Sequence, residues 1–178
     1  MARVGAFAAL FVYTCIMIYS LEGVLKRKQD TWAVIEVSGI GYKVTLPLFV
    51  MSKLPLVGEK VSILTHHHIR EDASDLYGFM SDDELSLFES LISVSGIGPK
   101  SAMGIMGVAP IGELVAAINE GRVDLLSKAS GVGKKTAERA ILDLKGKLTF
   151  ADTSGTIKKM EGDSELEETL VGLGYSKA

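Results

Sequence analysis

The sequence Ser95-Gly96-Ile97-Gly98-Pro99-Lys100-Ser101-Ala102 recurs 35 residues later as Ser130-Gly131-Val132-Gly133-Lys134-Lys135-Thr136-Ala137. The two copies share serine, glycine, a branched aliphatic residue, glycine, lysine, a hydroxyl residue and alanine at matching positions. Apolar residues at helical spacing precede and follow each copy. The repeat therefore predicts two units of helix, turn and helix. We call their turns the first glycine turn (95–101) and the second glycine turn (130–136).

The residue types in these turns predict a binding site for phosphate groups. Glycines spaced by one residue permit positive φ angles and let a ligand approach the backbone closely. Each following helix begins at the second glycine, so its first N–H groups lack partners at the positive end of the helix dipole. A lysine adds a full charge in each copy, and the aliphatic residue is expected to pack back between the helices. The predicted binding residues are Gly96, Ile97, Gly98, Lys100, Ser101, Gly131, Val132, Gly133, Lys134, Lys135, Thr136 and Arg139.

Other interpretations of glycine and lysine in a turn fit less well. A single Gly-x-Gly turn is also an ordinary connector, but two copies with a lysine at the same place favour a binding role. The P-loop pattern G-x-x-x-x-G-K-[ST] fails because Lys128 stands at its first glycine and Lys135 at its hydroxyl position. The dinucleotide pattern G-x-G-x-x-G fails because Ser101 and Thr136 stand at the third glycine. The sequence therefore argues against ATP binding and predicts no cofactor.

Charge is distributed unevenly along the 178 residues, whose formal net charge is −3. Residues 100–147 carry eight Lys and Arg against five Asp and Glu, whereas residues from 149 onward carry three against six. A basic segment suited to DNA is thus masked in the total by an acidic tail. The single cysteine, Cys15, cannot form an internal disulfide, which fits a reducing compartment. We expect a cytoplasmic protein with no membrane partner.

Strand-like and helical patterns divide the chain into an α+β fold. Runs rich in β-branched and aromatic residues predict a five-stranded barrel of the oligonucleotide-binding type over residues 17–80, with a simple antiparallel meander as the alternative. Ser81 and Glu84 form a capping-box pattern, which opens a helical domain over residues 81–148. The predicted strands are 18–25, 32–37, 42–46, 60–68 and 76–79, with a helical turn over 49–54.

The two ends of the chain depart from this pattern. Residues 1–16 are almost uniformly apolar, and we interpret them as upstream sequence ahead of a start at Met17. A signal peptide is the alternative, but no small-x-small cleavage site follows. Residues 149–163 are polar and small and predict a flexible linker. Residues 164–178 turn helical again but end too soon to bury an apolar face alone.

Acidic and histidine residues near the end of the predicted barrel leave several interpretations open. The consecutive histidines 66–68 point to alternate faces of a strand, so all three cannot converge on one metal ion. The carboxylates that follow form a solvated turn, a metal site or a negative point that repels DNA phosphates. In one alternative the chain is a metal-dependent nuclease that uses Glu71, Asp72 and Asp75 with His66 or His68. A glycosylase would need an aspartate beyond the second glycine turn, where Asp143 is expected to be a solvated surface residue.

The chain resembles the RuvA family of Holliday-junction-binding proteins over residues 17 to about 148, and as a fragment over 164–178. The glycine turns alone identify only a helix-hairpin-helix motif, which glycosylases, ligases and nucleases share, so a general duplex-binding module stays an alternative. The residues that carry the resemblance are Met17-Ile18, Leu21-Glu22-Gly23, Gly39-Ile40-Gly41-Tyr42, Thr65-His66, Arg70-Glu71-Asp72-Ala73, Leu76-Tyr77-Gly78-Phe79, Gly96-Ile97-Gly98-Pro99-Lys100 and Gly131-Val132-Gly133-Lys134-Lys135-Thr136-Ala137-Glu138-Arg139.

This resemblance implies sequence-independent binding of four-way junction DNA, without catalytic activity or a metal of its own. Family members form homotetramers that hold the junction open, one or two tetramers per junction, with an acidic pin that maps onto Glu71 and Asp72. A third domain recruits RuvB, a hexameric ATPase that drives branch migration in recombination, repair and the SOS response; the RuvC resolvase is a further implied partner. Only the first helix of that three-helix domain is visible, in residues 164–178, the segment through which the motor would bind.

Overall fold

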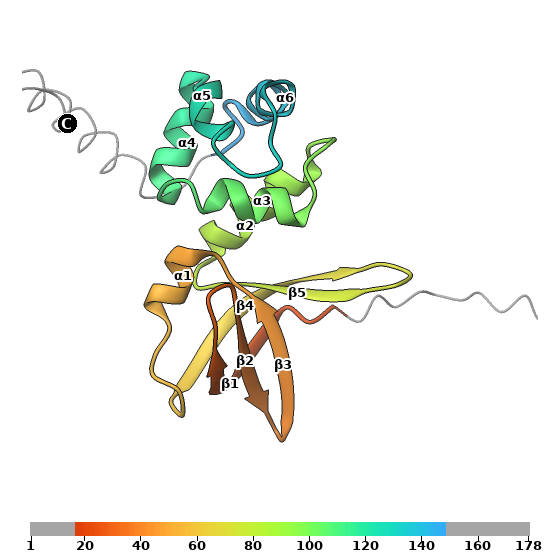
Figure 1. The fold of residues 1–178 in the computed structure, drawn as a ribbon, viewed down its shortest axis with the longest axis vertical. Coiled ribbons are helices and arrows are strands. Elements are labelled where there is room, and N and C mark those ends of the chain that lie inside the picture. Colours follow the sequence, from red (N-terminus) through yellow and green to blue (C-terminus); the bar gives the residue numbers. More distant parts are fainter. Residues whose placement is uncertain (1–16, 149–178) are drawn as a thin grey trace, which may run out of the picture.

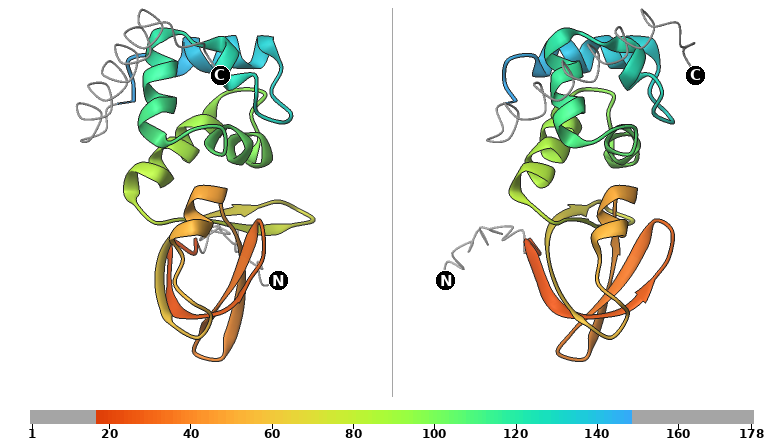
Figure 2. Two further views of the ribbon diagram at one scale, coloured as in Figure 1. Left: turned by 60° about the vertical axis from the view of Figure 1, so that its left-hand side comes forward. Right: turned by 90° about the vertical axis from the view of Figure 1, so that its left-hand side faces the viewer.

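The computed structural model describes residues 17–148. They form a β-barrel followed by a helical domain, which stacks on one end of the barrel (Figures 1 and 2). This arrangement confirms the predicted α+β fold class. The predicted leader, linker and C-terminal fragment lie outside the described residues. The elements are β1 (Ser20–Lys28), β2 (Trp32–Val37), β3 (Ile40–Thr45), α1 (Leu48–Lys53), β4 (Lys60–Ile69), β5 (Ser74–Phe79), α2 (Asp82–Ser93), α3 (Pro99–Met106), α4 (Ile111–Glu120), α5 (Val123–Leu126) and α6 (Lys134–Leu144).

The strands close into a barrel in the order β1-β2-β3-β5-β4. All neighbouring pairs are antiparallel except β3 and β5, which pair in parallel through Val44 with Leu76 and Thr45 with Tyr77. This short pairing joins the two ends of the sheet, so the structure is the barrel and not the alternative open meander. Alternate residues of each strand fill the interior; Ala33 and Ile35 of β2, for example, are fully buried.

At Gly23, β1 lies so close to β2 that no side chain fits between the two strands. A Cβ atom at this position would lie 2.2 Å from the carbonyl oxygen of Glu36, which is fixed in β2. A backbone atom cannot move aside as a flexible side chain can. Glycine at position 23 is therefore required by the close approach of β1 and β2 rather than by chain flexibility.

One apolar cluster joins the end of the barrel to the helices, while a second cluster fills the barrel interior. Tyr77 and Phe79 of β5 belong to the same buried cluster as the helical residues. Phe88 of α2 stacks on both, with ring centroids 5.2 and 5.0 Å away. Because the two parts share this first cluster, the position of the helices relative to the barrel is fixed by packing.

Glu84 anchors the start of α2 against the barrel. Its N–H donates to the Ser81 side chain at 3.3 Å, as the capping box predicts. Its buried carboxylate accepts from the N–H of Met80 at 2.7 Å, one residue before the position that the pattern predicts. The same carboxylate accepts from the ammonium of Lys53 at 3.1 Å. Lys53 belongs to α1, which lies at the end of the barrel that faces the helical domain (Figure 1). Both oxygens of the buried Glu84 carboxylate thus have a partner, one an ammonium group and the other a backbone N–H.

The predicted strands and the helical turn over 49–54 lie within two or three residues of their observed bounds. The helices that lead into the two glycine turns differ in length. The helix before the second glycine turn, α5, is a single turn of four residues, whereas α2 before the first has 12. The two repeats are therefore alike in their turns and not in their leading helices.

Within residues 17–148 no single helix has the length and apolar composition to cross a membrane; α3 and α4 meet that criterion only as a pair, bent by 103°.

Candidate nucleic-acid interface

The two glycine turns have the same backbone conformation. Gly96 and Gly131 have positive φ angles of 94° and 78°, which an L-amino acid with a side chain rarely adopts. Ile97 and Val132 each donate their N–H to the carbonyl oxygen three residues earlier, at 3.0 and 3.1 Å. Their side chains are 4% and 5% exposed and belong to the helical core. The prediction that they pack back between the helices is confirmed.

Helices α3 and α6 begin at Gly98 and Gly133 with their N-termini open to solvent. Both glycines are exposed, and a Cβ atom built on either would meet no heavy atom of residues 17–148 within 4 Å. Neither N-cap is satisfied by a side chain from the described part of the chain. Pro99 has no N–H, so α3 offers the N–H groups of Lys100 and Ser101, whereas α6 offers those from Lys134 onward, to a ligand that approaches the glycines.

The charges at these two N-termini reverse the usual preference. Helix α2 carries three acidic residues in its first turn, which the positive end of its dipole favours. The first turns of α3 and α6 carry no acidic residue but hold Lys100, Lys134 and Lys135, all exposed. A lysine at this position is unfavourable by about 0.3–1 kcal/mol in the absence of an anion. The arrangement is one that a bound phosphate would stabilise.

The two turns lie against each other through reciprocal contacts. The hydroxyl of Ser101, the last residue of the first turn, lies 3.5 Å from the carbonyl oxygen of Gly131 in the second. Conversely, a Cβ atom at Gly96 would lie 4.0 Å from the Cγ2 of Thr136, the residue that matches Ser101 in the repeat. The tandem is therefore a single interface with two similar halves. Arg139, on α6, donates from Nη1 to the carbonyl oxygen of Ser95 at 3.4 Å.

The predicted acidic pin occupies the β4–β5 loop, residues 70–73. The N–H of Arg70 donates to the carbonyl oxygen of Ala73 at 2.8 Å and closes the loop. Glu71 and Asp72 lie between these residues and are exposed. The β4–β5 hairpin extends away from the rest of the barrel, with its loop at the tip (Figure 1). The two carboxylates therefore stand at the end of a projecting hairpin.

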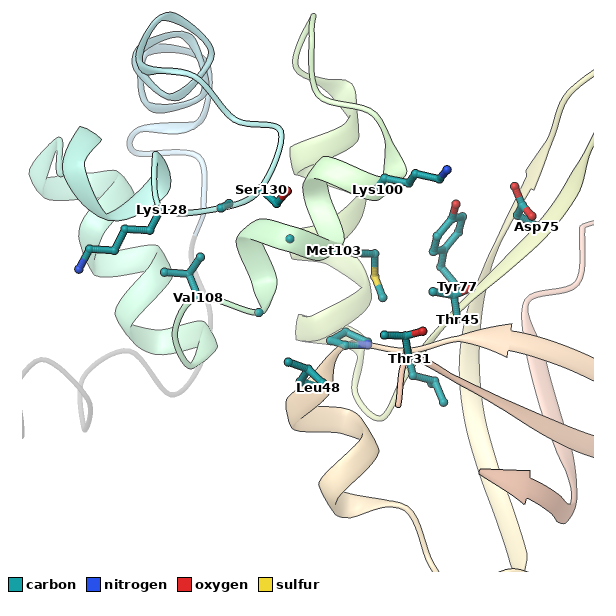
Figure 3. Close-up of a pocket in the computed structure, with 15 residues that line it drawn as sticks. Thr31, Thr45, Leu48, Asp75, Tyr77, Lys100, Met103, Val108, Lys128 and Ser130 are labelled. Atoms are coloured by element: carbon teal, nitrogen blue, oxygen red, sulfur yellow. The ribbon is translucent and has the colours of Figure 1, made fainter. Parts of the chain in front are cut away.

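Two clefts connect this hairpin with the first glycine turn. A cleft of about 240 Å³ is lined by His68 and Arg70 from the β4–β5 hairpin and by Gly98 and Lys100 from the turn. A larger cleft of about 730 Å³ lies between α3 and the barrel. Figure 3 shows Lys100 extending from α3 toward the strand that carries Tyr77 and Asp75. The base of the pin and the first turn thus face one another.

Tyr77 lies at the border of both clefts. Burial raises the pKa of its phenol above the usual value, Asp75 adds to this effect and Arg70 opposes it. Arg70 also pairs with Asp75 at 3.2 Å. Tyr77 is therefore a neutral phenol at physiological pH, and Asp75 is engaged by a cation beside it.

The residues of the nuclease alternative do not converge. His66 pairs with Glu89 of α2 at 3.1 Å and packs edge-on against Phe88, so its ring faces the helices and not the β4–β5 loop. His68 lines the smaller cleft. Within residues 17–148 no group of three or more His, Cys, Asp or Glu side chains is placed to hold a metal ion. Asp143, the candidate of the glycosylase alternative, lies on α6 and is half-buried, more enclosed than the sequence predicted.

Sequence reasoning found the two turns but missed several residues that surround them. The twelve predicted binding residues lie in or directly after the turns, and their contact with DNA stays a prediction. His68, Tyr77 and Met103 approach the first turn only in the folded structure, and no local pattern marks them. Gly104 is different: extending the 35-residue comparison beyond the turns pairs it with Arg139.

Comparisons with known proteins agree with the fold and the turns. The RuvA N terminal domain matches residues 17–78, and the SAM-like Helix-hairpin-helix tandem matches residues 88–146. Three similar proteins are each named Holliday junction branch migration complex subunit RuvA. That of Dehalococcoides mccartyi is 43% identical over 91% of this chain and 84% of its own length. Those of Neisseria meningitidis and Methylibium petroleiphilum are 44% and 39% identical over 90% of this chain and 85% of their lengths. With this similarity over both the barrel and the paired turns, the chain belongs to the RuvA family.

Proposed function

We propose that this chain binds four-way DNA junctions through their sugar-phosphate backbones, without reading base sequence, as the DNA-binding subunit of a branch migration complex. The observation that carries the proposal is the pair of open, lysine-bearing helix N-termini at the glycine turns. The names of the similar proteins support the same function, since each is a subunit of a Holliday junction branch migration complex.

The chemistry of the turns fits binding that ignores sequence. Backbone N–H groups and lysine ammonium groups contact phosphate oxygens, which are identical at every base pair. Two turns that lie side by side can hold two phosphate groups at once, and simultaneous binding strengthens the attachment of each. Branch migration exchanges base pairs of any sequence, so a subunit that holds the backbone alone suits the process.

The β4–β5 loop supports a preference for junctions over linear duplex. Glu71 and Asp72 are exposed at the tip of the hairpin, whose base faces the first glycine turn across the smaller cleft. DNA held by the turn would bring phosphate groups near these carboxylates, and like charges repel. In our proposal the loops of four subunits meet at the centre of the junction, where strands must separate.

Assembly and partners extend this proposal. A homotetramer places one pair of turns on each junction arm, with one or two tetramers per junction. The chain has no catalytic activity of its own in this account, and an ATPase motor, RuvB, supplies the energy of branch migration. The motor would bind through residues 164–178, which lie outside the described residues.

Competition between DNA structures tests the proposal. A labelled four-way junction is bound at one fixed salt concentration and displaced by unlabelled junction or by linear duplex of equal length and sequence. We expect the junction to compete far better than the duplex, and two junctions of unrelated sequence to compete equally. Equal competition by duplex and junction would favour a general duplex-binding module.

The same binding reaction, supplied with Mg²⁺ and ATP, tests the absence of catalysis. The junction should remain intact and ATP should not be consumed unless a motor is added. Cleavage of the junction that disappears in Glu71→Ala would support the nuclease alternative instead.

A further inference from the structure

The repeat continues beyond the two turns and becomes asymmetric. At the 35-residue offset Ser95 matches Ser130, and Gly104 on α3 matches Arg139 on α6. Each member of the second pair approaches the serine of the opposite turn: Gly104 approaches Ser130, and Arg139 approaches Ser95. The same place in each half is thus filled by the smallest residue in one copy and by a long cation in the other.

Gly104 marks a direct contact between α3 and the second glycine turn. A Cβ atom at this position would lie 3.3 Å from the carbonyl oxygen of Ser130 and 3.8 Å from the Cβ of Ala129. The nearest atom belongs to the backbone of the turn, which cannot move aside without moving the turn. Figure 3 shows Ser130 lying beside α3. Glycine here lets the second turn rest directly on the helix that begins at the first.

Arg139 makes the corresponding contact with the first turn through its long side chain. Its guanidinium spans from α6 to the first turn and donates to the carbonyl oxygen of Ser95 at 3.4 Å. Ser95 immediately precedes Gly96, so this bond holds the backbone of the first turn. The two contacts together fix one turn relative to the other from both sides.

We propose that Gly104 and Arg139 are positioning residues that set the separation of the two phosphate-binding turns. This inference rests on the proposed function, because it assumes that both turns bind phosphate groups. Phosphate groups on DNA have a fixed spacing, so both turns bind at once only if their separation matches it. Where geometry prevents simultaneous binding, the gain from having two sites is lost. Arg139, expected from the sequence to contact DNA, acts in this account through the first turn.

A neutral substitution at Gly104 tests the inference, with Gly107→Ala as the matched control. A Cβ atom at Gly107 would meet only carbonyl oxygens of its own helix, at 3.4 and 3.5 Å, so this variant changes the same helix without touching the second turn. Binding to linear duplex is measured as a function of salt concentration, together with the thermal midpoint of unfolding. Duplex is chosen because the result then does not depend on a preference for junctions.

We expect Gly104→Ala to weaken duplex binding about tenfold, the loss of one charge-assisted contact. The slope of log affinity against log salt should become shallower by about one unit, although no charge is removed. The thermal midpoint should change little, because the helix propensity that alanine gains opposes the strain of its close contact with Ser130. Gly107→Ala should keep the wild-type slope. Wild-type affinity and slope in Gly104→Ala would overturn the inference.

A double-mutant cycle tests Arg139 independently of how Gly104→Ala folds. If Arg139 acts through the first turn, the effects of Arg139→Ala and Lys100→Ala should fall well short of additive, since both impair the same phosphate contact. Additive effects with Lys100→Ala would assign Arg139 to a direct phosphate contact and overturn its positioning role. If the wild-type chain bound junction and duplex equally, the proposed function would be contradicted. The two tests above would still be interpretable, because both measure binding to duplex.

Discussion

At the scale of single residues, the charges of the interface fall into two groups with opposite effects on DNA. Lys100 and Lys135 lie at open helix N-termini, where we propose that they attract phosphate groups. Glu71 and Asp72 lie at the tip of the β4–β5 hairpin, where we propose that they repel phosphate groups. In our proposal the first group accounts for affinity, and the second group accounts for discrimination between DNA structures.

Neutralising the acidic pin should separate affinity from discrimination. We expect the double variant Glu71→Gln and Asp72→Asn to bind DNA more tightly, by roughly 1 kcal/mol or about fivefold, because it removes two repulsive charges. The preference for a four-way junction over duplex should shrink. Competition binding with both DNA structures measures the two effects. The control is Glu22→Gln with Asp30→Asn, two exposed carboxylates of the barrel region. Weaker binding in the pin variant would contradict the repulsive role.

At the scale of secondary-structure elements, each glycine turn depends on one aliphatic side chain. Ile97 and Val132 are buried between the helices that flank their turns, and the glycines before them supply the positive φ angles. The turn is thus held by packing on its inner side while its outer side stays open. Each seven-residue turn is therefore both rigid and accessible to a ligand.

Truncating the buried side chain of the first turn should lower stability. Ile97→Ala removes a nearly fully buried side chain, and we expect a loss of about 2–5 kcal/mol in the free energy of unfolding. Ile40→Ala is the control, since Ile40 is 59% exposed, and its effect should stay within about 0.5 kcal/mol. Urea denaturation measures both. Equal, small losses in the two variants would contradict the packing role of Ile97.

Local patterns were sufficient for the turns and the strands, and insufficient for what joins them. The glycine pairs, the capping serine and the β-branched runs each report a local backbone conformation, so the sequence predicts them directly. The apolar residues Leu125 and Leu126 indicate a helical segment before the second turn but not its length, and α5 proves to be a single turn that ends at Leu126. The contact of Gly104 with Ser130 depends on how two distant segments pack, and a glycine in a helix does not by itself reveal its neighbour.

At the scale of the whole molecule, the barrel and the helices form one rigid unit. Phe88 packs on Tyr77 and Phe79, and Glu84 pairs with Lys53 across the same boundary. The β4–β5 hairpin, which belongs to the barrel, is thereby held facing the first glycine turn, which belongs to the helices. The first glycine turn and the acidic loop therefore face each other because the barrel and the helices pack together, and neither segment alone predicts this arrangement.

Assembly should follow from the proposed function. We expect the chain to form a homotetramer and to bind one junction per tetramer or per pair of tetramers. Native mass measurement with and without junction DNA gives the number of copies and the stoichiometry together. A single copy bound to one junction would contradict an assembly with one pair of turns on each arm.

The central claim is that the two glycine turns hold DNA by its phosphate groups, and the salt dependence of binding tests it most directly. Affinity for a four-way junction is measured over a range of salt concentrations for the wild-type chain, for Lys100→Ala with Lys135→Ala, and for the exposed barrel lysine variant Lys60→Ala as control. Each lost phosphate contact reduces the slope of log affinity against log salt by about 0.9. We predict that the double variant binds more weakly with a slope shallower by about two units, while Lys60→Ala keeps the wild-type slope. An unchanged slope in the double variant would contradict the claim.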